Sequence, residues 1–367
     1  MERVTKKFVI KWTQSKKQDF TDDHRGWPKG KRRTWSKLTE KKVKKIHQDL
    51  ESNPFKFFTG ASAIDQEWRK RFKTSPPPLR TIGKILADSG LSSKRRKDRH
   101  KGASRYLCYP EHTIYTRLKG RVAESDFIGK KYIIGRTKPL NFISFSFKKK
   151  PKLRHFKRVE SQTADCFIDE FERFSQKFEK PDFVKVDNCL AAIGSASGKR
   201  NLSRVMKYLL KKQVIPIFAV PRKPFSQASI EGNNSVFSRK FWHRFQFKNL
   251  KDVDEKLGWF NKASQEYLEY QKPKVKLEKK KFVPKVYFIR QVKEDQTKKK
   301  MNGYIEILND IVYLPKAYIN YFVLAKWNIN EEKLYIYFEK EQKSKLIKKL
   351  LFKINRRSKW GGILSFD

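Results

Sequence analysis

The sequence predicts a multidomain protein: a helix-turn-helix region, an α/β core with a mixed sheet, and a small C-terminal β-barrel. Three observations predict it. Short helical patterns broken by Pro and Gly come first, alternating strand and helix patterns follow, and closely spaced strand patterns end the chain. The predicted regions are a basic arm 1–38, the helix-turn-helix region 39–118, the core 119–272, a linker 273–284, the barrel 285–340 and a basic tail 341–367.

The charge predicts a polyanionic partner. The chain has 367 residues, with 87 Lys and Arg against 38 Asp and Glu, and a formal net charge of +49. Such a charge repels itself unless a polyanion neutralises it, and nucleic acid is the first candidate. Acidic membrane and ribosomal RNA are the alternatives. A hydrophobic fraction of 38%, with 29 Phe, provides enough apolar material for packed cores.

The N-terminal sequence and the spacing of the cysteines predict a cytoplasmic location. The N-terminal sequence MERVTKKFVIKW has scattered charges and no apolar stretch typical of a signal peptide. No window approaches the roughly 20 apolar residues that a membrane span needs. The three cysteines have no C-x-x-C spacing, which favours a reducing compartment.

The region 39–118 predicts three short helices. Thr39 is the expected N-cap of the first, the second runs from Ala61 to Phe72, and SPPPLRTIGKILADSGLS predicts the third. This arrangement suits a helix-turn-helix, although an ordinary three-helix cap has the same pattern. The flanking basic clusters KGKRR and KRRKDRHK favour DNA contact. The residues then expected to face the groove are Arg80, Thr81 and Lys84.

The region 119–272 alternates strands and helices. SDFIGKKYIIG and NFISFSFKKK predict strands, and SQTADCFIDEFERFSQKFE predicts an amphipathic helix capped by Ser161 or Thr163. DFVKV and VIPIFAVP predict two further strands, SRVMKYLLKKQ a helix between them, and SIEGNNSVFSRKFW a last helix. Beyond the linker, strand patterns such as KVYFIRQV, GYIEIL and KLYIYFE follow at short intervals and predict the barrel.

Three acids in the core are candidate catalytic residues. Asp126 lies inside the first predicted strand, Asp187 ends a later strand, and Glu231 opens a helix. Converging carboxylates repel one another, and a divalent cation relieves that repulsion. Oxygen ligands of this kind suit Mg²⁺ or Mn²⁺, and two ions could activate a nucleophile and stabilise a leaving oxygen.

Ordinary structural roles compete with this interpretation. Acids at strand ends commonly cap helices or pair with Lys, and Glu231 at a helix start also interacts favourably with the helix dipole. Other acids of the core could be combined into a triad equally well by position alone: Glu124, Asp165, Asp169 and Asp182.

The motifs resemble the catalytic core of DDE transposases related to retroviral integrases. VDN after an apolar strand, then VIPIFAVPRKPFSQASIEGNNSVFSRKFW, is similar to that family's D-N-G, strand, proline-bearing loop and glutamate helix. Asp126 in ESDFIG stands at the place of the family's first aspartate. The resemblance implies an RNase-H-like core, a helix-turn-helix before it, and an SH3-like barrel after it. Catalytic and metal-binding roles then fall on Asp126, Asp187 and Glu231.

The chain departs from the family pattern in two places. Cys189 replaces the glycine of D-N-G, so its backbone must keep an ordinary conformation. The interval from Asp187 to Glu231 is longer than in retroviral integrases, and GSASGKRN looks like the inserted piece. That loop could contact DNA through Lys199 and Arg200.

The resemblance also implies an activity and partners. The expected reaction is divalent-metal-dependent cleavage at mobile-element ends and strand transfer into target DNA, with Mg²⁺ or Mn²⁺, and two ions in each site. The expected partners are double-stranded DNA and further copies of the chain, in the nucleoid. Candidate phosphate contacts are Arg222, Lys223, Arg239 and Lys240. The alternatives are a catalytically inactive DNA-binding regulator derived from a transposase, and an RNase-H-like nuclease.

Overall fold

A computed structural model of the protein describes residues 35–92, 109–194, 198–273, 282–295 and 302–355. The basic arm as far as residue 34, the cluster at 94–101, most of the linker 273–284 and the tail beyond residue 355 lie outside these ranges. Within them, no helix is both long and apolar enough to cross a membrane.

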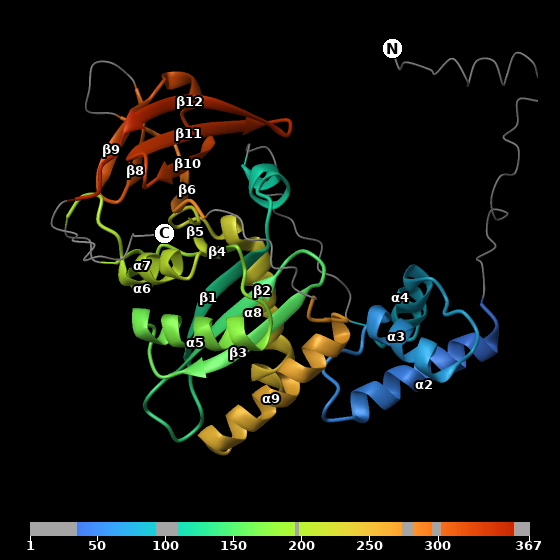
Figure 1. The fold of residues 1–367 in the computed structure, drawn as a ribbon. Coiled ribbons are helices and arrows are strands. Elements are labelled where there is room, and N and C mark those ends of the chain that lie inside the picture. The colour runs from blue at the N-terminus through green and yellow to red at the C-terminus, as the bar shows by residue number, and fades with distance from the viewer. Residues whose placement is uncertain (1–34, 93–108, 195–197, 274–281, 296–301, 356–367) are drawn as a thin grey trace, which may run out of the picture.

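The described elements follow the predicted order of helices, core and C-terminal strands (Figure 1). The helices and helical turns are α2 (Lys37–Ser52), α3 (Ala61–Arg71), α4 (Leu79–Asp88), η2 (Thr113–Arg117), α5 (Ala164–Lys177), α6 (Leu190–Ile193), α7 (Arg204–Lys211), η3 (Pro224–Gln227), α8 (Ala228–Lys240), η4 (Trp242–Arg244), α9 (Leu250–Tyr267) and η5 (Lys316–Tyr318). The strands are β1 (Val122–Lys131), β2 (Leu140–Phe147), β3 (Leu153–Val159), β4 (Phe183–Val186), β5 (Ile215–Phe218), β6 (Lys285–Gln291), β7 (Lys293–Glu294), β8 (Gly303–Ile307), β9 (Asp310–Leu314), β10 (Phe322–Asn328), β11 (Lys333–Lys340) and β12 (Lys343–Leu351).

A mixed sheet forms the centre of the molecule, as the alternating patterns predict. Its strand order is β12-β11-β10-β6-β5-β4-β1-β2-β3. Strands β1, β2 and β3 pair antiparallel, whereas β4 is parallel to β1, β5 to β4, and β6 to β5. Parallel strands need crossover connections, and here helices α6 and α7 connect β4 to β5.

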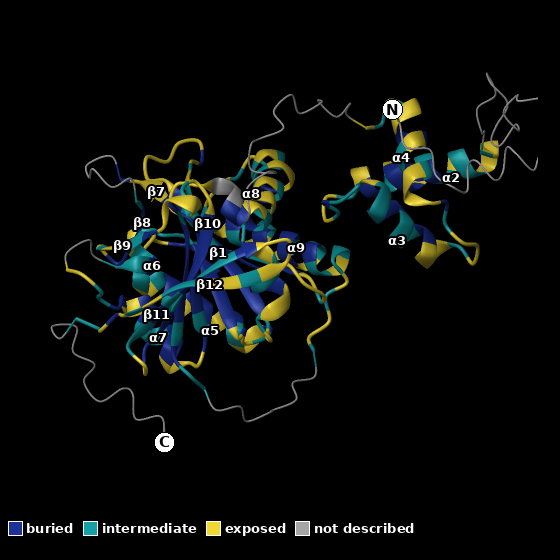
Figure 2. Cartoon of the chain, turned by 90° about the horizontal axis from the view of Figure 1, so that it is seen from above, coloured by how far each residue is buried: buried dark blue, intermediate teal, exposed yellow. Residues whose placement is uncertain are grey.

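Helices cover both faces of the core sheet, and its strands are buried (Figure 2). On one face, phenylalanines of α5 and apolar residues of α7 pack on β1, β2 and β4. On the other face, Phe237 of α8 and Phe260 of α9 pack on Phe142 and Phe156. The periodic phenylalanines Phe167, Phe171 and Phe174 are all buried, which explains the aromatic richness of the sequence.

The three N-terminal helices share an apolar core of their own. It contains Val43 and Ile46 of α2, Trp68 of α3 and Ile82 of α4. The helix boundaries agree with the prediction except at the first N-cap. Thr39 is wrong as that cap, because the Ser36 hydroxyl accepts a hydrogen bond from the Thr39 amide at 3.2 Å and α2 begins at Lys37.

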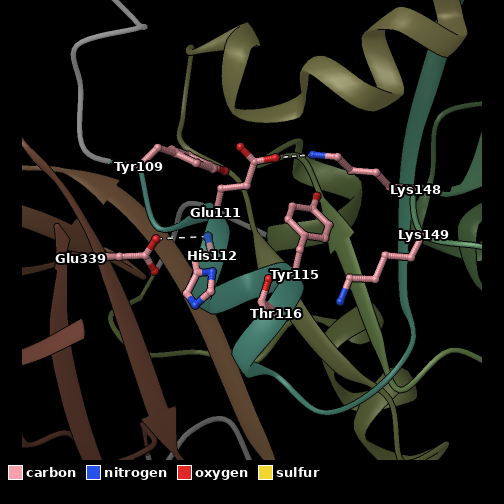
Figure 3. Close-up of a pocket in the computed structure, with 8 residues that line it drawn as sticks. All are labelled: Tyr109, Glu111, His112, Tyr115, Thr116, Lys148, Lys149 and Glu339. Atoms are coloured by element: carbon pink, nitrogen blue, oxygen red, sulfur yellow. Dashed lines mark hydrogen bonds and ion pairs between the residues drawn. The ribbon is translucent and has the colours of Figure 1, made fainter. Parts of the chain in front are cut away.

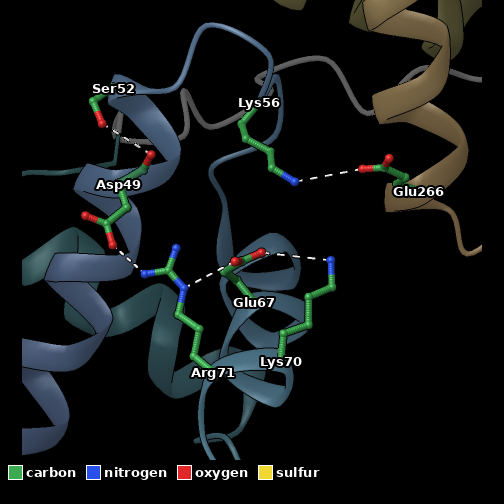
Figure 4. Close-up of polar contacts among 7 residues, drawn as sticks. All are labelled: Asp49, Ser52, Lys56, Glu67, Lys70, Arg71 and Glu266. Atoms are coloured by element: carbon green, nitrogen blue, oxygen red, sulfur yellow. Dashed lines mark hydrogen bonds and ion pairs between the residues drawn. The ribbon is translucent and has the colours of Figure 1, made fainter.

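Polar and aromatic contacts attach this helical region to α9 of the core. Lys56 forms an ion pair with Glu266 at 3.8 Å, shown in Figure 4 beside the Asp49–Arg71–Glu67 network of α2 and α3. Gln66 Nε2 donates to the Tyr267 carbonyl at 2.9 Å. The ring of Phe58 stacks on that of Tyr267, with centroids 4.2 Å apart.

The predicted SH3-like barrel at 285–340 is corrected by the strand pairing. The strands form where the patterns place them, but β6 pairs with β5, so β6, β10, β11 and β12 continue the core sheet. Strands β7, β8 and β9 form a small separate antiparallel sheet that shares the apolar core. The physical reason is that β5 has an open edge, and β6 satisfies its backbone hydrogen-bonding groups.

Part of the expected basic tail 341–367 is also regular structure. Residues Lys343–Leu351 form β12, which pairs with β11 along its length. The Lys348 ammonium donates to the Tyr313 carbonyl of β9 at 2.6 Å, so this strand also contacts the small sheet.

Candidate active site

Neighbouring parallel strands place two of the predicted acids side by side. Glu124 of β1 lies opposite Lys185 of β4 in the strand register. Side chains two residues apart on a strand share a face, so Asp126 and Asp187 follow next on that same face. Asp187 comes directly after β4, where the strand leaves the sheet. Both side chains are half-buried.

Helix α8 provides the third acid. Glu231 lies in the first turn of α8, and Asn234 lies one turn later on the same side of the helix. Asn234 Nδ2 donates to Asp126 Oδ2 at 2.8 Å, and Asn234 Oδ1 accepts from the Ser144 hydroxyl of β2 at 2.9 Å. These contacts hold α8 against β1 and β2 and turn the Glu231 side of the helix toward the two aspartates.

The three carboxylates lie within range of one another's charge. Burial, then the charge of Asp187 and, more weakly, that of Glu231 raise the pKa of Asp126 to about 6, although hydrogen bonds from the Phe127 amide and Asn234 oppose the shift. Burial and the charge of Asp187 also raise the pKa of Glu231. Mutual repulsion of this kind is common at functional sites.

None of these three acids is neutralised by Lys or Arg in the part of the chain that the structure describes. The competing acids behave differently. Asp165 pairs with Arg204, Asp182 accepts a hydrogen bond from the Arg121 amide at 2.6 Å, and Glu124 pairs with Lys185. Asp169 is exposed on α5. In a chain with 87 Lys and Arg, three acids of one candidate site without a cation partner among the described residues are a distinctive feature.

The donor chemistry of this acidic group fits a divalent cation. Carboxylate oxygens are hard ligands, and their shared repulsion gives a cation a favourable place to bind. Across the described ranges, however, no three His, Cys, Asp or Glu side chains are drawn together as a ready metal-ligand cluster. Glu231 is exposed and would have to swing toward the aspartates to share an ion with them.

Cys189 adopts a backbone conformation that any residue can take. Its φ is −67° and its ψ is 155°, so the residue does not need the left-handed region that favours glycine. It is the N-cap of α6, and burial with the nearby charges of Asp187 and Asp126 raises the pKa of its thiol. The substitution at the family's glycine position is therefore compatible with the expected loop.

A buried ion pair below the acids was missed by the sequence interpretation. Glu124 and Lys185 are 1% and 2% exposed, and their Oε1 and Nζ atoms lie 3.6 Å apart. The Tyr115 hydroxyl of η2 donates to Glu124 Oε1, and Lys185 Nζ donates to the Tyr115 oxygen at 3.3 Å. Burial lowers the pKa of Lys185. The alternation of side chains along β1 and β4 was the only signal that could have paired them.

A cavity of about 520 Å³ lies beside this pair but contains none of the three acids (Figure 3). Glu339 of β11 accepts from the His112 and Thr113 amides at 3.1 and 2.7 Å and so fixes the start of η2. Lys148 pairs with Glu111 across the opening. Since its lining contains none of Asp126, Asp187 and Glu231, this cavity is separate from the acidic group.

The predicted DNA-contacting residues fall into three groups. On α4, Arg80 and Lys84 are exposed and Thr81 is half-buried. Lys199 and Arg200 both pair with Asp310 of β9, so they contact the C-terminal strands of their own chain. The remaining four are exposed before and at the end of α8: Arg222, Lys223, Arg239 and Lys240.

Comparison with known proteins found low-scoring structural matches only. No protein-family model matches this chain, and neither does any curated protein. Among solved structures, a chain of the simian T-cell lymphotropic virus intasome in complex with PP2A regulatory subunit B56 gamma has a TM-score of 0.34 and 11% identity. That match covers 74% of this chain and 96% of the other.

Two further solved structures give weaker matches. The HTLV-2 integrase catalytic core domain in complex with magnesium has a TM-score of 0.28 and 13% identity, over 38% of this chain and 82% of that one. The NurA nuclease from Sulfolobus solfataricus has a TM-score of 0.18 and 8% identity, over 65% and 70%.

Proposed function

We propose that this protein is a DDE-type DNA transposase, which cleaves DNA at the ends of a mobile element and joins the freed ends to target DNA. The observation that carries the proposal is the acidic group. Asp126, Asp187 and Glu231 come from β1, the end of β4 and α8. Burial and the charge of Asp187 raise the pKa of Asp126 and of Glu231, and no basic side chain among the described residues forms an ion pair with the three acids. The motif resemblance assigns its catalytic roles to the same three acids.

The three acids would hold Mg²⁺ or Mn²⁺, which would supply charge neutralisation for the phosphodiester and activation of the attacking oxygen. The chain's own contribution is an ionised carboxylate and its orientation. With a pKa of about 6 in the metal-free protein, Asp126 is ionised at neutral pH and is available as an oxygen ligand. Asn234 orients that carboxylate through its hydrogen bond.

The reaction consists of two exchanges at phosphorus, a hydrolysis and then a transesterification. Water first attacks the phosphodiester at the element end, one P–O bond forms as another breaks, and a 3′-hydroxyl is released. That hydroxyl then attacks a phosphodiester of the target, so the element end becomes joined as a target 3′-hydroxyl leaves. Neither exchange needs an oxidant, a reductant or a covalent intermediate on the protein.

DNA is the partner that this reaction requires. The net charge of +49 would favour contacts with phosphates on both sides of the acidic group. Arg80 and Lys84 on the exposed side of α4 are candidates for sequence reading, and Arg222, Lys223, Arg239 and Lys240 for phosphate contacts near Glu231. Because two element ends must be processed together, the active form is proposed to be a homo-oligomer assembled on DNA.

A strand-transfer assay tests the proposal. Purified protein is incubated with Mg²⁺ or Mn²⁺, a supercoiled plasmid and labelled DNA that carries the element's own ends. Asp187→Ala and Glu231→Gln run beside the wild type, with Asp165→Asn as a matched control, since Asp165 is an exposed acid paired with Arg204 on another helix. We expect joined product from the wild type and the control, and none from the two active-site variants.

The other outcomes separate the alternative functions. Binding of the ends by all variants, without cleavage in either metal, would favour a DNA-binding regulator. Cleavage of RNA in an RNA–DNA hybrid, without joining of DNA ends, would favour an RNase-H-like nuclease. Either result would overturn the transposase assignment.

A further inference from the structure

A buried arginine of the C-terminal strands lies behind the Asp187 loop. Arg290 of β6 is 5% exposed. Its Nε donates to the Glu306 carbonyl of β8 at 2.8 Å, and its Nη1 to the carbonyls of Ala219 and Ile289 at 3.1 and 2.9 Å. Its Nη2 donates to Asn188 Oδ1 at 3.0 Å. All these acceptors are neutral, although a buried guanidinium usually pairs with an acid.

Asn188 links this guanidinium to the loop that carries Asp187. The Asn188 amide accepts from Arg290 and also donates through Nδ2 to the Ala219 carbonyl at 2.5 Å. On the other side of Asp187, the Val186 carbonyl accepts from the Ala219 amide at 3.0 Å. Val186 and Asn188, the residues on either side of Asp187, are therefore both hydrogen-bonded to Ala219. Arg290 donates to Ala219 and also to Asn188.

Arg290 is also a nearby positive charge for Asp187. Burial lowers the pKa of Arg290 to about 10, while the charges of Glu306 and Asp187 oppose that shift. The guanidinium therefore stays cationic at neutral pH. It makes no ion pair with Asp187, so the carboxylate keeps its oxygens available while it experiences a favourable field.

We propose that Arg290 is a positioning residue for Asp187, and that the C-terminal strands thereby complete the active site in addition to any contact they make with DNA. This inference rests on the proposed function, because it assigns Asp187 a role in catalysis. The fork geometry of arginine matters here, since three of its nitrogens donate at once in fixed directions. A lysine would keep the charge but lose most of these contacts.

The test compares full-length variants in the strand-transfer assay. Arg290→Lys keeps the charge, Asn188→Ala removes the link to the loop, and Arg290→Ala removes both charge and fork. Arg158→Lys is the matched control, because Arg158 lies on the edge strand β3 and makes a two-pronged contact with Asp254 of α9. Each variant is assayed for kcat, for KM toward DNA, for its pH profile and for Mn²⁺ affinity by calorimetry without DNA.

Loss of a residue that orients an active-site group should lower kcat and weaken Mn²⁺ binding, each by about 10- to 100-fold, without a change in KM. We expect this for Arg290→Lys and Asn188→Ala. The double variant should be as active as the less active of the two single variants, because both changes break the same link. The control should behave like the wild type.

Chemical rescue distinguishes positioning from general stability. A cavity of about 190 Å³, lined in part by Asn188, Pro221 and Arg290, opens beside the guanidinium. Millimolar guanidinium should therefore restore part of the activity of Arg290→Ala but none of that of Asp187→Asn. Arg290 variants with wild-type kcat and Mn²⁺ affinity would overturn the inference, as would losses that follow melting temperature alone and resist rescue. If Asp187→Asn is fully active, the proposed function fails instead.

Discussion

At the scale of single residues, Asp126 carries the clearest sign of function. Its pKa is raised from 3.8 to about 6, first by burial and then by Asp187. Between those pH values the folded chain binds a proton that the unfolded chain does not, so stability falls as pH rises through this window. Above pH 6 the full free-energy cost of the buried Asp126 charge reduces the stability of the folded protein. Carboxylates with pKa values raised in this way are common at functional sites.

This pH dependence leads to a stability prediction. Asp126→Asn should be more stable than the wild type by about 1–3 kcal/mol at pH 7.5 in metal-free buffer, because the buried negative charge is removed. Near pH 4 the two proteins should unfold alike, since Asp126 is then protonated. Urea unfolding at both pH values provides the measurement. An Asn variant that is less stable at pH 7.5 would show that the carboxylate has a stabilising structural role.

At the scale of elements, helix α8 contributes to the candidate site through Asn234, which joins the helix to the sheet. Asn234 holds α8 on β1 through Asp126, whereas its neighbour Asn233 accepts from Arg154 Nε at 2.8 Å. The two asparagines thus allow a matched comparison on one helix, because Asn234 contacts one of the three acids and Asn233 contacts Arg154. The hydrogen bond from Asn234 also lowers the pKa of Asp126 against the effect of burial.

Removing this hydrogen bond should shift the pH profile of DNA cleavage. In Asn234→Ala the pKa of Asp126 rises further, so the acid limb should move to higher pH. Activity should fall about 3- to 10-fold near pH 6.5 and recover in part near pH 8.5. Asn233→Ala should keep the wild-type profile. Coincident profiles for the two variants would contradict the role given to Asn234.

Local sequence patterns predicted the positions of the elements but not all of the strand pairing. Helix and strand positions were predictable, because periodicity and turn residues report on the local chain: α3, α4 and the strand before Asp187 formed where expected. The Ser36 cap was missed because both Ser and Thr are favoured at an N-cap and both lie at this helix start. The pairing of β6 with β5 depends on an edge that local patterns do not describe, so a separate barrel was the natural but incorrect expectation.

The candidate site was predictable only in part for the same reason. Asp187 and Glu231 lie in motifs, and Asp126 could be chosen from its place in the first core strand. Arg290 lies far along the chain in a segment expected to bind DNA, and no motif connects it to Asp187. The Glu124–Lys185 pair was hidden among many acids and lysines, since only the strand register brings these two together.

At the scale of the whole molecule, core and C-terminal strands form one structure. Phe218 of β5 stacks on Phe288 of β6 with ring centroids 5.3 Å apart, and both are fully buried. Apolar residues of β4, β6, β8 and β10 belong to one core. A protein built this way should unfold in a single transition over these segments.

Truncation tests this continuity. A chain that ends at residue 273 would expose the edge of β5 and its phenylalanine, so we expect it to aggregate or to lose cooperative melting. A chain that ends at Asn355 keeps every described strand and should melt like the full-length protein. Size-exclusion chromatography and thermal denaturation give the comparison. A monomeric 1–273 chain with the full-length melting temperature would mean that the C-terminal strands are an independent unit.

The central claim is that Asp126, Asp187 and Glu231 act as one metal-binding site, and calorimetric Mn²⁺ titration of the full-length protein tests it most directly. The wild type should bind Mn²⁺, and Asp126→Asn, Asp187→Asn and Glu231→Gln should each weaken that binding by at least about 10-fold, since each removes a charged oxygen ligand. Asp165→Asn should bind like the wild type. Equal Mn²⁺ affinity in all five proteins, or no binding at millimolar Mn²⁺, would contradict the claim.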